Sequence, residues 1–291
     1  MATIYKSKEG KEHILSQYEH YLTQFDLPID REYVDTRFGK THVLKLGRPD
    51  GKPLFIFQGG NCINPMTLSW FKGLLTDYKI YAPDTIGHPG YSDEARISAS
   101  DQSFANWIDD LMAHFQIEKC AFIGPSYGGG IILRLAAFMP EKIHCAVLIA
   151  PAGISLGSKA QMIKDILVPM LFFKMNGSAK SLRKIANAMS RSSMNDMDEG
   201  MIGSIFKYVS LEDEMPKLTT AQELKDYHAP TLVITGTEDI FFPERKISQK
   251  AAGLFGNQLE LKRYTMGHFP SAEDLTKIDS DIKSFLIKHY L

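Results

Sequence analysis

The sequence reads GPSYGGG at residues 124–130, and this stretch decides the expected fold. An apolar, strand-like run at residues 121–123 precedes it, and a helix-like run follows it. A chain that turns sharply from strand to helix through a serine holds that serine exposed at the end of the sheet. The flanking glycines suit such a turn because a Cβ would collide there. The pattern predicts Ser126 as a nucleophile, with the backbone N–H of Tyr127 pointing at any charge that forms beside it.

Strand-like and helix-like segments alternate along most of the chain. This alternation predicts an α/β fold, a mostly parallel sheet of about eight strands with helices on both faces. The expected strands lie at residues 33–36, 41–46, 54–57, 79–82, 121–123, 146–150, 231–235 and 259–264. The first two are expected to form a hairpin.

The alternation breaks at Pro151, and residues 152–222 show helical patterns without a convincing strand. We therefore predict a core domain of residues 1–151 and 223–291 and a helical cap of residues 152–222 over the strand ends. Residues 1–30 are expected to be a helical N-terminal extension of the core.

Eight of the 13 methionines fall inside the expected cap. Methionine is flexible and polarizable, so these side chains could line a pocket for irregular apolar ligands or fill the small core of the cap. Both interpretations stay open. The most apolar run of the cap predicts Ile166, Met170, Phe172 and Phe173 as part of the substrate pocket.

Composition excludes several classes of protein. The 291 residues are 44% hydrophobic with a net charge of −1, and no long run of one sign suggests nucleic-acid binding. No window of about 18 apolar residues predicts a membrane span, and the polar N-terminus does not resemble a signal peptide. Three cysteines without metal-ligand spacing indicate reduced thiols in a cytoplasmic protein. No cofactor or metal motif is found, so the expected partner is a small-molecule substrate, and a homo-oligomer stays open.

A nucleophilic serine needs a base, an acid that orients the base, and donors for the oxyanion. His268 follows the last expected strand and is the leading candidate for the base. Asp239 follows the preceding strand, which places its carboxylate beside that histidine. His88 lies in a loop that could reach the same place and is the main competitor for the role of base.

The residues Gly59-Gly60-Asn61 follow the expected strand at 54–57. We predict the backbone N–H of Gly60 as the second oxyanion donor, with Asn61 close by, opposite the N–H of Tyr127. A plain glycine turn is the alternative interpretation. Trp70 and Trp107 are expected to be core residues.

These features together resemble the α/β-hydrolase-fold serine hydrolases, in particular the capped, esterase- or lipase-like branch. The order Ser126, Asp239, His268 matches the nucleophile, acid and base of that superfamily. The resemblance covers residues 33–150 and 223–290, and the insertion falls where the superfamily commonly carries a cap. Gln58 departs from the pattern, because a histidine usually stands before the two glycines.

The resemblance implies an acyl-enzyme hydrolase, most simply a carboxylesterase acting on small to medium apolar esters. Other activities of the same fold, namely carbon–carbon bond hydrolysis, aminopeptidase cleavage and perhydrolysis, stay open because they share the triad. A ligand receptor or regulatory protein with little turnover is the alternative from another class.

Overall fold

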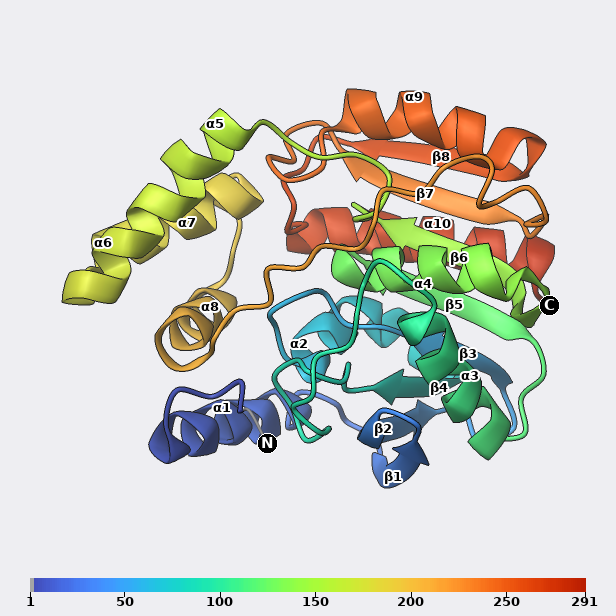
Figure 1. Cartoon of the computed structure of the whole chain (residues 1–291), viewed down its shortest axis with the longest axis horizontal. Helices are drawn as coiled ribbons and strands as arrows, with labels where there is room; N and C mark the ends of the chain where they lie inside the picture. Colours follow the sequence, from blue (N-terminus) through green and yellow to red (C-terminus); the bar gives the residue numbers. More distant parts are fainter. Residues whose placement is uncertain (1–2) are drawn as a thin grey trace.

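The computed structural model describes residues 3–291 and contains one eight-stranded sheet with the strand order β1-β2-β4-β3-β5-β6-β7-β8 (Figure 1). The strand β2 pairs antiparallel with β1 and β4, and the remaining pairs are parallel. The bounds of the strands are β1 Asp30–Thr36, β2 Gly39–Gly47, β3 Lys52–Ile56, β4 Tyr78–Pro83, β5 Cys120–Pro125, β6 Ile143–Ile149, β7 Thr231–Gly236 and β8 Leu259–Tyr264. The predicted fold class and the hairpin at the start of the sheet are confirmed.

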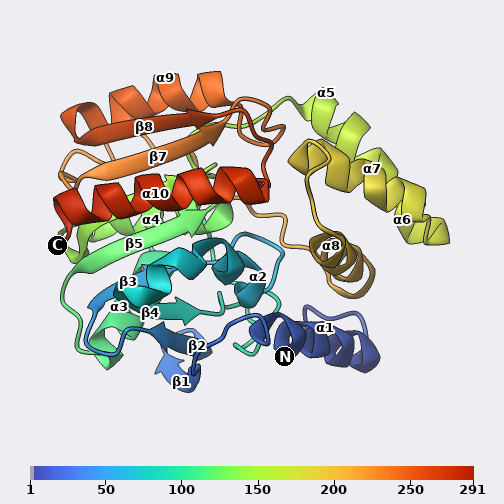
Figure 2. The same ribbon diagram turned by 180° about the vertical axis from the view of Figure 1, so that it is seen from behind.

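Helices cover both faces of the sheet, as Figures 1 and 2 show from opposite sides. One face carries α3 (Ser103–His114), α4 (Tyr127–Phe138) and α9 (Glu244–Phe255). The other carries the 3-10 segment η1 (Ser69–Thr76), which continues the short α2 (Asn64–Leu68), and α10 (Ala272–His289). Because both sides are covered, β5 and β7 are entirely buried, and their residues are mostly apolar.

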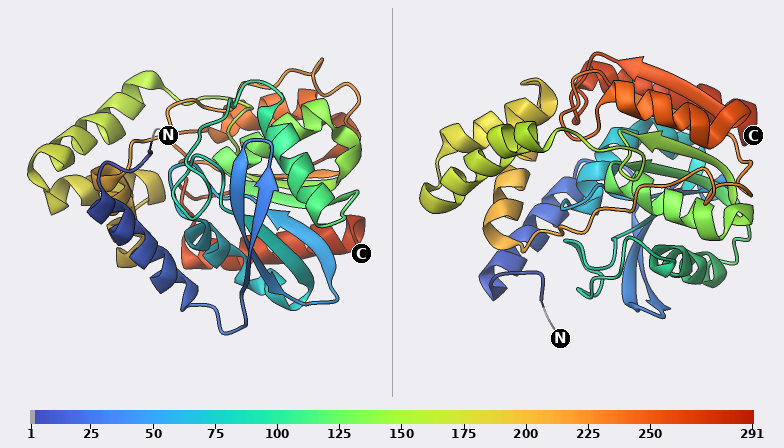
Figure 3. Two further views of the ribbon diagram at one scale, coloured as in Figure 1. Left: turned by 60° about the horizontal axis from the view of Figure 1, so that its bottom comes forward. Right: turned by 45° about the horizontal axis from the view of Figure 1, so that its top comes forward.

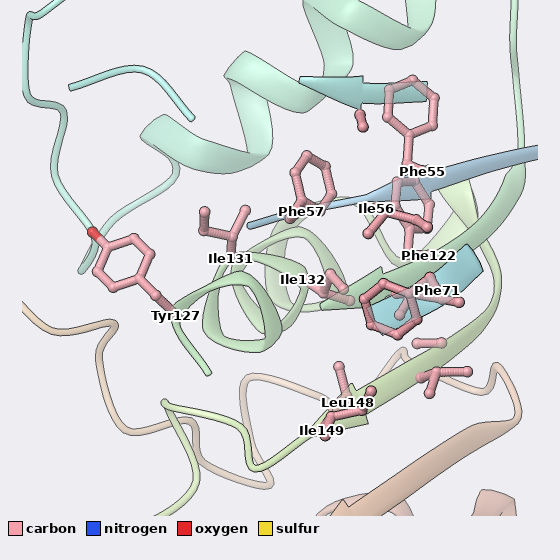
Figure 4. Close-up of a cluster of buried hydrophobic side chains, with 14 of the residues drawn as sticks. Phe55, Ile56, Phe57, Phe71, Phe122, Tyr127, Ile131, Ile132, Leu148 and Ile149 are labelled. Atoms are coloured by element: carbon pink, nitrogen blue, oxygen red, sulfur yellow. The ribbon is translucent and has the colours of Figure 1, made fainter. Parts of the chain in front are cut away.

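The centre of the core lies between β3, β5 and α4 (Figure 4). The rings of Phe55 and Phe57 stack on Phe122 at centroid distances of 5.7 and 6.0 Å. Ile131 and Ile132 of α4 are buried in the same cluster. This packing fixes the strand and the helix on either side of Ser126, so the turn between them has a rigid support.

The chain between β6 and β7 leaves the sheet and forms four α-helices: α5 (Lys159–Met162), α6 (Val168–Asn176), α7 (Ala179–Ser190) and α8 (Asp196–Tyr208). A single π-helical turn, Ile163–Leu167, joins α5 to α6. Figure 3 shows these helices standing beyond one end of the sheet, next to α1 (Lys8–Leu22). The helix α1 packs against α8, so the N-terminal extension supports the inserted helices from below.

Candidate active site

Ser126 lies between β5 and α4 in a backbone conformation that non-glycine residues rarely adopt, with φ 51° and ψ −118°. Its N–H donates to the carbonyl of Ile149 at 2.8 Å, and its carbonyl accepts from the N–H of Ala152 at 3.0 Å. Both contacts come from the end of β6 and the residues just after it. They hold the serine in the strained turn that the sequence predicts.

Two glycines make this turn sterically possible. A Cβ on Gly124 would lie 2.4 Å from the carbonyl carbon of Gly128, and a Cβ on Gly128 would lie 2.5 Å from the carbonyl oxygen of Phe57. Both distances are far shorter than van der Waals contact, so a side chain at either position would push strand and helix apart. The glycine pattern of the sequence therefore has a direct structural reason.

Asp239 and His268 meet at the carboxyl ends of β7 and β8. The Nδ1 of His268 and the Oδ2 of Asp239 are 2.8 Å apart, and both side chains are buried. The other carboxylate oxygen of Asp239 accepts from the backbone N–H groups of Phe241 and Phe242, at 2.8 and 3.1 Å. Three donors thus fix the orientation of the carboxylate, and the carboxylate fixes that of the imidazole ring.

Aromatic rings hold His268 on several sides. Its centroid is 4.8 Å from that of Phe241, 5.5 Å from Phe242 and 5.9 Å from Phe269. The N–H of Phe269 donates to the carbonyl of Met189, at the end of α7, at 2.9 Å. The loop that carries His268 is therefore tied to the inserted helices as well as to the sheet.

The loop after β3 brings Gly60 against Tyr127. A Cβ on Gly60 would lie 3.0 Å from the Cβ of Tyr127, so the two residues are direct neighbours. Within residues 3–291, the backbone N–H groups of Gly60 and Tyr127 donate to no protein acceptor, whereas that of Gly59 donates to the Thr67 hydroxyl. Two unsatisfied N–H groups side by side are what an oxyanion requires.

Gln58, which departs from the usual sequence pattern, is fully buried and supports this loop. Its Nε2 donates to the carbonyl of Cys62 at 2.6 Å, and its Oε1 accepts from the N–H of Thr85 at 3.1 Å. One amide side chain therefore spans from the loop after β3 to the loop after β4. The sequence shows that Gln58 stands where a histidine is usual, but it does not show that Gln58 itself supports the loop after β3.

A cavity of about 270 Å³ contains Ser126, Tyr127, Gly60, Asn61 and His268 in its wall. Its remaining wall is largely apolar, with contributions from η1, the inserted helices and the loop after β7. No Asp, Glu, Lys or Arg is among the lining residues. The cavity therefore suits an uncharged, apolar ligand.

The inserted helices supply part of this wall, though not all of the residues predicted for it. Ile166 and Met170 line the cavity. Phe172 and Phe173 do not: Phe172 is 52% exposed, and Phe173 packs toward α8 near Gly203. The π-helical turn before α6 shifts the phase of the helix, which apolar composition alone does not reveal.

The methionines of the insertion have mixed roles. Four of them line the cavity, while Met201 is buried among the inserted helices and Met175 is exposed. The four are Met162, Met170, Met189 and Met215. Neither of the two interpretations left open by the sequence accounts for all eight.

Several wall residues were missed by the sequence analysis. Trp70, expected in the core, lines the cavity with its ring against Phe269 at 5.6 Å, whereas Trp107 is indeed buried. Phe241 and Phe242 also line it, and their position just after Asp239 is a signal that could have been used. Trp70 could not be recognised because a helical face toward a cavity has the same pattern as one toward the core.

Cys62 is a second potential nucleophile in the cavity wall. Burial raises the pKa of its thiol to about 11, and only part of that effect is offset by its hydrogen bond with Thr67. Little thiolate exists at neutral pH, so Cys62 is poorly reactive compared with a cysteine of ordinary pKa.

His88 packs its ring against that of Tyr127 at 4.8 Å but is not part of the cavity wall. Burial lowers the pKa of His88 to about 4, which keeps the ring neutral. No carboxylate of the described residues bonds to it, so it lacks the acid partner that His268 has.

The described residues offer neither a cluster of metal ligands nor a helix that could span a membrane. Among residues 3–291, no group of three or more His, Cys, Asp or Glu is arranged to hold a metal ion. None of the helices in this range combines the length and the apolar character needed to cross a bilayer.

Comparisons with known proteins agree with this fold. Residues 52–176 match the model of the alpha/beta hydrolase fold family. The carboxylesterase YbfK of Bacillus subtilis is 24% identical over 277 residues, which cover 92% of each chain. An uncharacterized carboxylesterase, nap, of the same organism is 25% identical over 261 residues, covering 87% of this chain and 85% of that one.

Solved structures agree with the same fold. The crystal structure of naproxen esterase (carboxylesterase NP) from Bacillus subtilis superposes with a TM-score of 0.81 at 21% identity, covering 97% of this chain and 99% of that one. The sheet order, the family match over residues 52–176 and these full-length similarities lead to one conclusion: the chain has the α/β-hydrolase fold.

Proposed function

We propose that the protein is a carboxylic ester hydrolase that works through an acyl-enzyme on Ser126. His268 is the general base and acid, and Asp239 orients it. The backbone N–H groups of Gly60 and Tyr127 bind the oxyanion. The observation that carries the proposal is the hydrogen bond between Asp239 and His268 at the edge of a cavity that also contains Ser126.

The first half of the reaction transfers the acyl group to the enzyme. The Oγ of Ser126 attacks the ester carbonyl while its proton moves to Nε2 of His268, the ring nitrogen that Asp239 leaves free. The carbonyl oxygen becomes an oxyanion between the two N–H groups. When the intermediate collapses, the alcohol leaves with the proton from His268, and the acyl group stays on the serine.

Water completes the cycle by the same route. His268 takes a proton from water as the water attacks the acyl carbon, and then returns the proton to Ser126 as the acid leaves. Within residues 3–291, the Ser126 hydroxyl forms no hydrogen bond with His268, so this link has to close when substrate binds. Catalytic hydrogen bonds are often longer in ligand-free enzymes, which is compatible with this step.

The cavity supports esters without charge close to the reacting bond. Its wall is apolar and contains no ionised side chain, so a charged group beside the carbonyl would be desolvated without a partner. The similar Bacillus proteins are carboxylesterases by name, which agrees with ester rather than amide cleavage. The proposed chemistry needs no metal ion or organic cofactor.

Covalent labelling tests the proposal directly. A fluorophosphonate should modify the protein at Ser126, and Ser126→Ala should remove both the label and the hydrolysis of chromogenic esters, with kcat lower by about four orders of magnitude or more. Ser284→Ala, a change of an exposed serine on α10, is the matched control and should label normally.

Other results would favour other functions. Tight ligand binding without a Ser126 adduct would contradict the proposal and favour a receptor. Labelling of Ser126 without turnover of any ester would point to one of the related hydrolase reactions, and a panel of amides and carbon–carbon bond substrates would identify it.

A further inference from the structure

A second cavity, of about 340 Å³, adjoins the one that contains Ser126. The two share five wall residues: Met162, Leu167, Met215, Phe241 and Phe242. The remaining wall of the second cavity is formed by Leu156, Gly157, Lys159 and Ile163. The shared side chains form a partition between an inner cavity, with the nucleophile, and an outer one.

Three side chains of the partition, Met162, Leu167 and Met215, can move, whereas Phe241 and Phe242 pack against His268. Methionine has three rotatable side-chain bonds and adapts to irregular spaces. Leu167 is 45% exposed and Met215 is 41% exposed, so either can turn toward solvent without opening the core. A ligand that reaches through this partition therefore displaces little packed structure.

The outer cavity opens on an apolar area of the surface. Leu156 and Ile163 in its wall are both about half exposed. Large apolar side chains in contact with solvent at the mouth of a cavity mark a binding site more often than a packing defect. A chain that enters from the inner cavity would cover them.

Three lysines lie at this opening or close to it. Lys159 lines the outer cavity, and Lys246 and Lys250 line a shallow depression that shares Leu156 with it. Lys246 donates to the carbonyl of Leu156 at 3.3 Å. Within residues 3–291, none of these three ammonium groups lies within 4.0 Å of a carboxylate, unlike many other lysines of the protein. Their charge is available to an anionic ligand group.

From these contacts we infer that the two cavities form one elongated site for esters with a long apolar chain that ends in an anionic group. The chain passes the partition and lies in the outer cavity, and its anionic end meets Lys159. This inference rests on the proposed function. Each cavity alone is near the lower end of the volumes usual for ligand sites, and the two together are well within that range.

Three methyl esters test the inference: methyl butyrate, methyl laurate and monomethyl dodecanedioate. The last two have chains of equal length and differ in the terminal carboxylate. Their binding to Ser126→Ala is measured by calorimetry and their hydrolysis by the wild type from proton release. Because binding needs no turnover, a protein that binds the esters as expected but hydrolyses none would contradict the proposed function and not this inference.

The expected order of affinity is dodecanedioate monoester, then laurate, then butyrate. Each additional buried methylene should improve binding by up to about fourfold, the equivalent of 0.8 kcal/mol. If methyl laurate binds no better than methyl butyrate, the inference is overturned, because the outer cavity then holds no part of the acyl chain.

A bulky residue in the outer cavity provides the second test. Ile163→Trp should reduce the advantage of laurate over butyrate by about tenfold or more, since it fills space that only the chain uses. Met175→Trp, on the same helical stretch but exposed and outside both cavities, is the matched control and should keep the advantage. Should Ile163→Trp fail to fold, Leu156→Trp replaces it. An unchanged laurate advantage in the folded variant would overturn the inference.

The charge at the opening is tested separately. Lys159→Gln should reduce the preference for dodecanedioate monoester over laurate by about twofold to fivefold, the range of an exposed ion pair, and high salt should do the same in the wild type. Lys180→Gln, an exposed lysine of α7 that lines neither cavity, should leave the preference unchanged. No preference in the wild type, or equal effects of the two variants, would overturn the role of Lys159.

Discussion

Asn61 and Glu212 form a reciprocal pair in which one side chain satisfies two backbone groups. The Nδ2 of Asn61 donates to the carbonyl of Glu212 at 2.9 Å, and the N–H of Glu212 donates to the Oδ1 of Asn61 at 2.7 Å. Asn61 adjoins Gly60 in the proposed oxyanion loop and has a positive φ of 51°. Glu212 lies in the segment that returns from α8 to β7. The loop is therefore attached to the insertion as well as to the sheet.

Asn61→Gly should lower kcat by about tenfold to a hundredfold while the fold persists. Glycine keeps the positive φ but removes both hydrogen bonds, so the donors of the loop lose their exact position. Steady-state kinetics with a chromogenic acetate measures the effect. Asn61→Asp places a carboxylate oxygen against the Glu212 carbonyl and a negative charge beside the oxyanion, so its kcat should be at least as low as that of Asn61→Gly. A normal kcat in Asn61→Gly would contradict a role for the pair.

Gln58→Leu should reduce both stability and turnover. The change leaves the N–H of Thr85 and the carbonyl of Cys62 without partners in a buried place, a cost of about 2–4 kcal/mol. Denaturant unfolding gives the stability, and kcat gives the effect on the loop. Gln222→Leu, a change of an exposed glutamine, is the control, and equal behaviour of the two variants would show that Gln58 supports nothing.

The sequence alone predicts the strands of the sheet and the chain order Ser126, Asp239, His268 of the proposed triad. Buried parallel strands are continuous apolar runs, and the residues after them must gather at one edge, so Asp239 and His268 could be placed together before any coordinates. Their 2.8 Å contact is the result of that topology.

What the sequence could not supply depends on tertiary packing. The side of α6 that faces the cavity depends on the π-helical turn at Ile163–Leu167, which has no local sequence signal. The support by Gln58 requires two loops, after β3 and after β4, that approach each other only in the folded sheet. The outer cavity could not be predicted for the same reason, because its wall residues Leu156 and Phe241 are distant in sequence.

Glu223→Gln should destabilise the protein by about 2 kcal/mol, because it leaves the buried guanidinium of Arg134 without its carboxylate. Burial raises the pKa of Glu223, but hydrogen bonds from Lys217 and Arg134 outweigh this and lower it to about 2. The melting temperature should fall by roughly 4–8 °C.

The pair is tested further by replacing both members. Arg134→Met combined with Glu223→Leu removes the unpaired charge and should recover part of the lost melting temperature. If Glu223→Gln melts like the wild type, the ion pair contributes nothing measurable.

His88 should make the protein sensitive to acid. Its pKa in the fold is about 4, below the ordinary 6.5, so the unfolded chain binds a proton more readily between these values. The stability associated with neutral His88 is complete above about pH 6.5 and is lost as the pH falls toward 4, on the order of 3 kcal/mol.

His88→Phe should therefore flatten the decline of melting temperature over this pH range. His144→Gln, at an exposed position, should keep the decline of the wild type. A His88→Phe curve parallel to that of the wild type would contradict the assignment.

The strands β6 and β7 pair directly, with Ala146 opposite Thr231, although the whole helical insertion separates them in the chain. The pairing of these two strands uses none of the inserted residues. Exchanging residues 152–222 for the corresponding part of a related protein should change the shape of the ligand chamber while β6 and β7 keep their register, provided that the exchanged segment keeps its backbone contacts to Ser126, Asn61 and Phe269. The shape of the chamber and the frame of the sheet therefore depend on different segments of the chain, joined by a few backbone contacts.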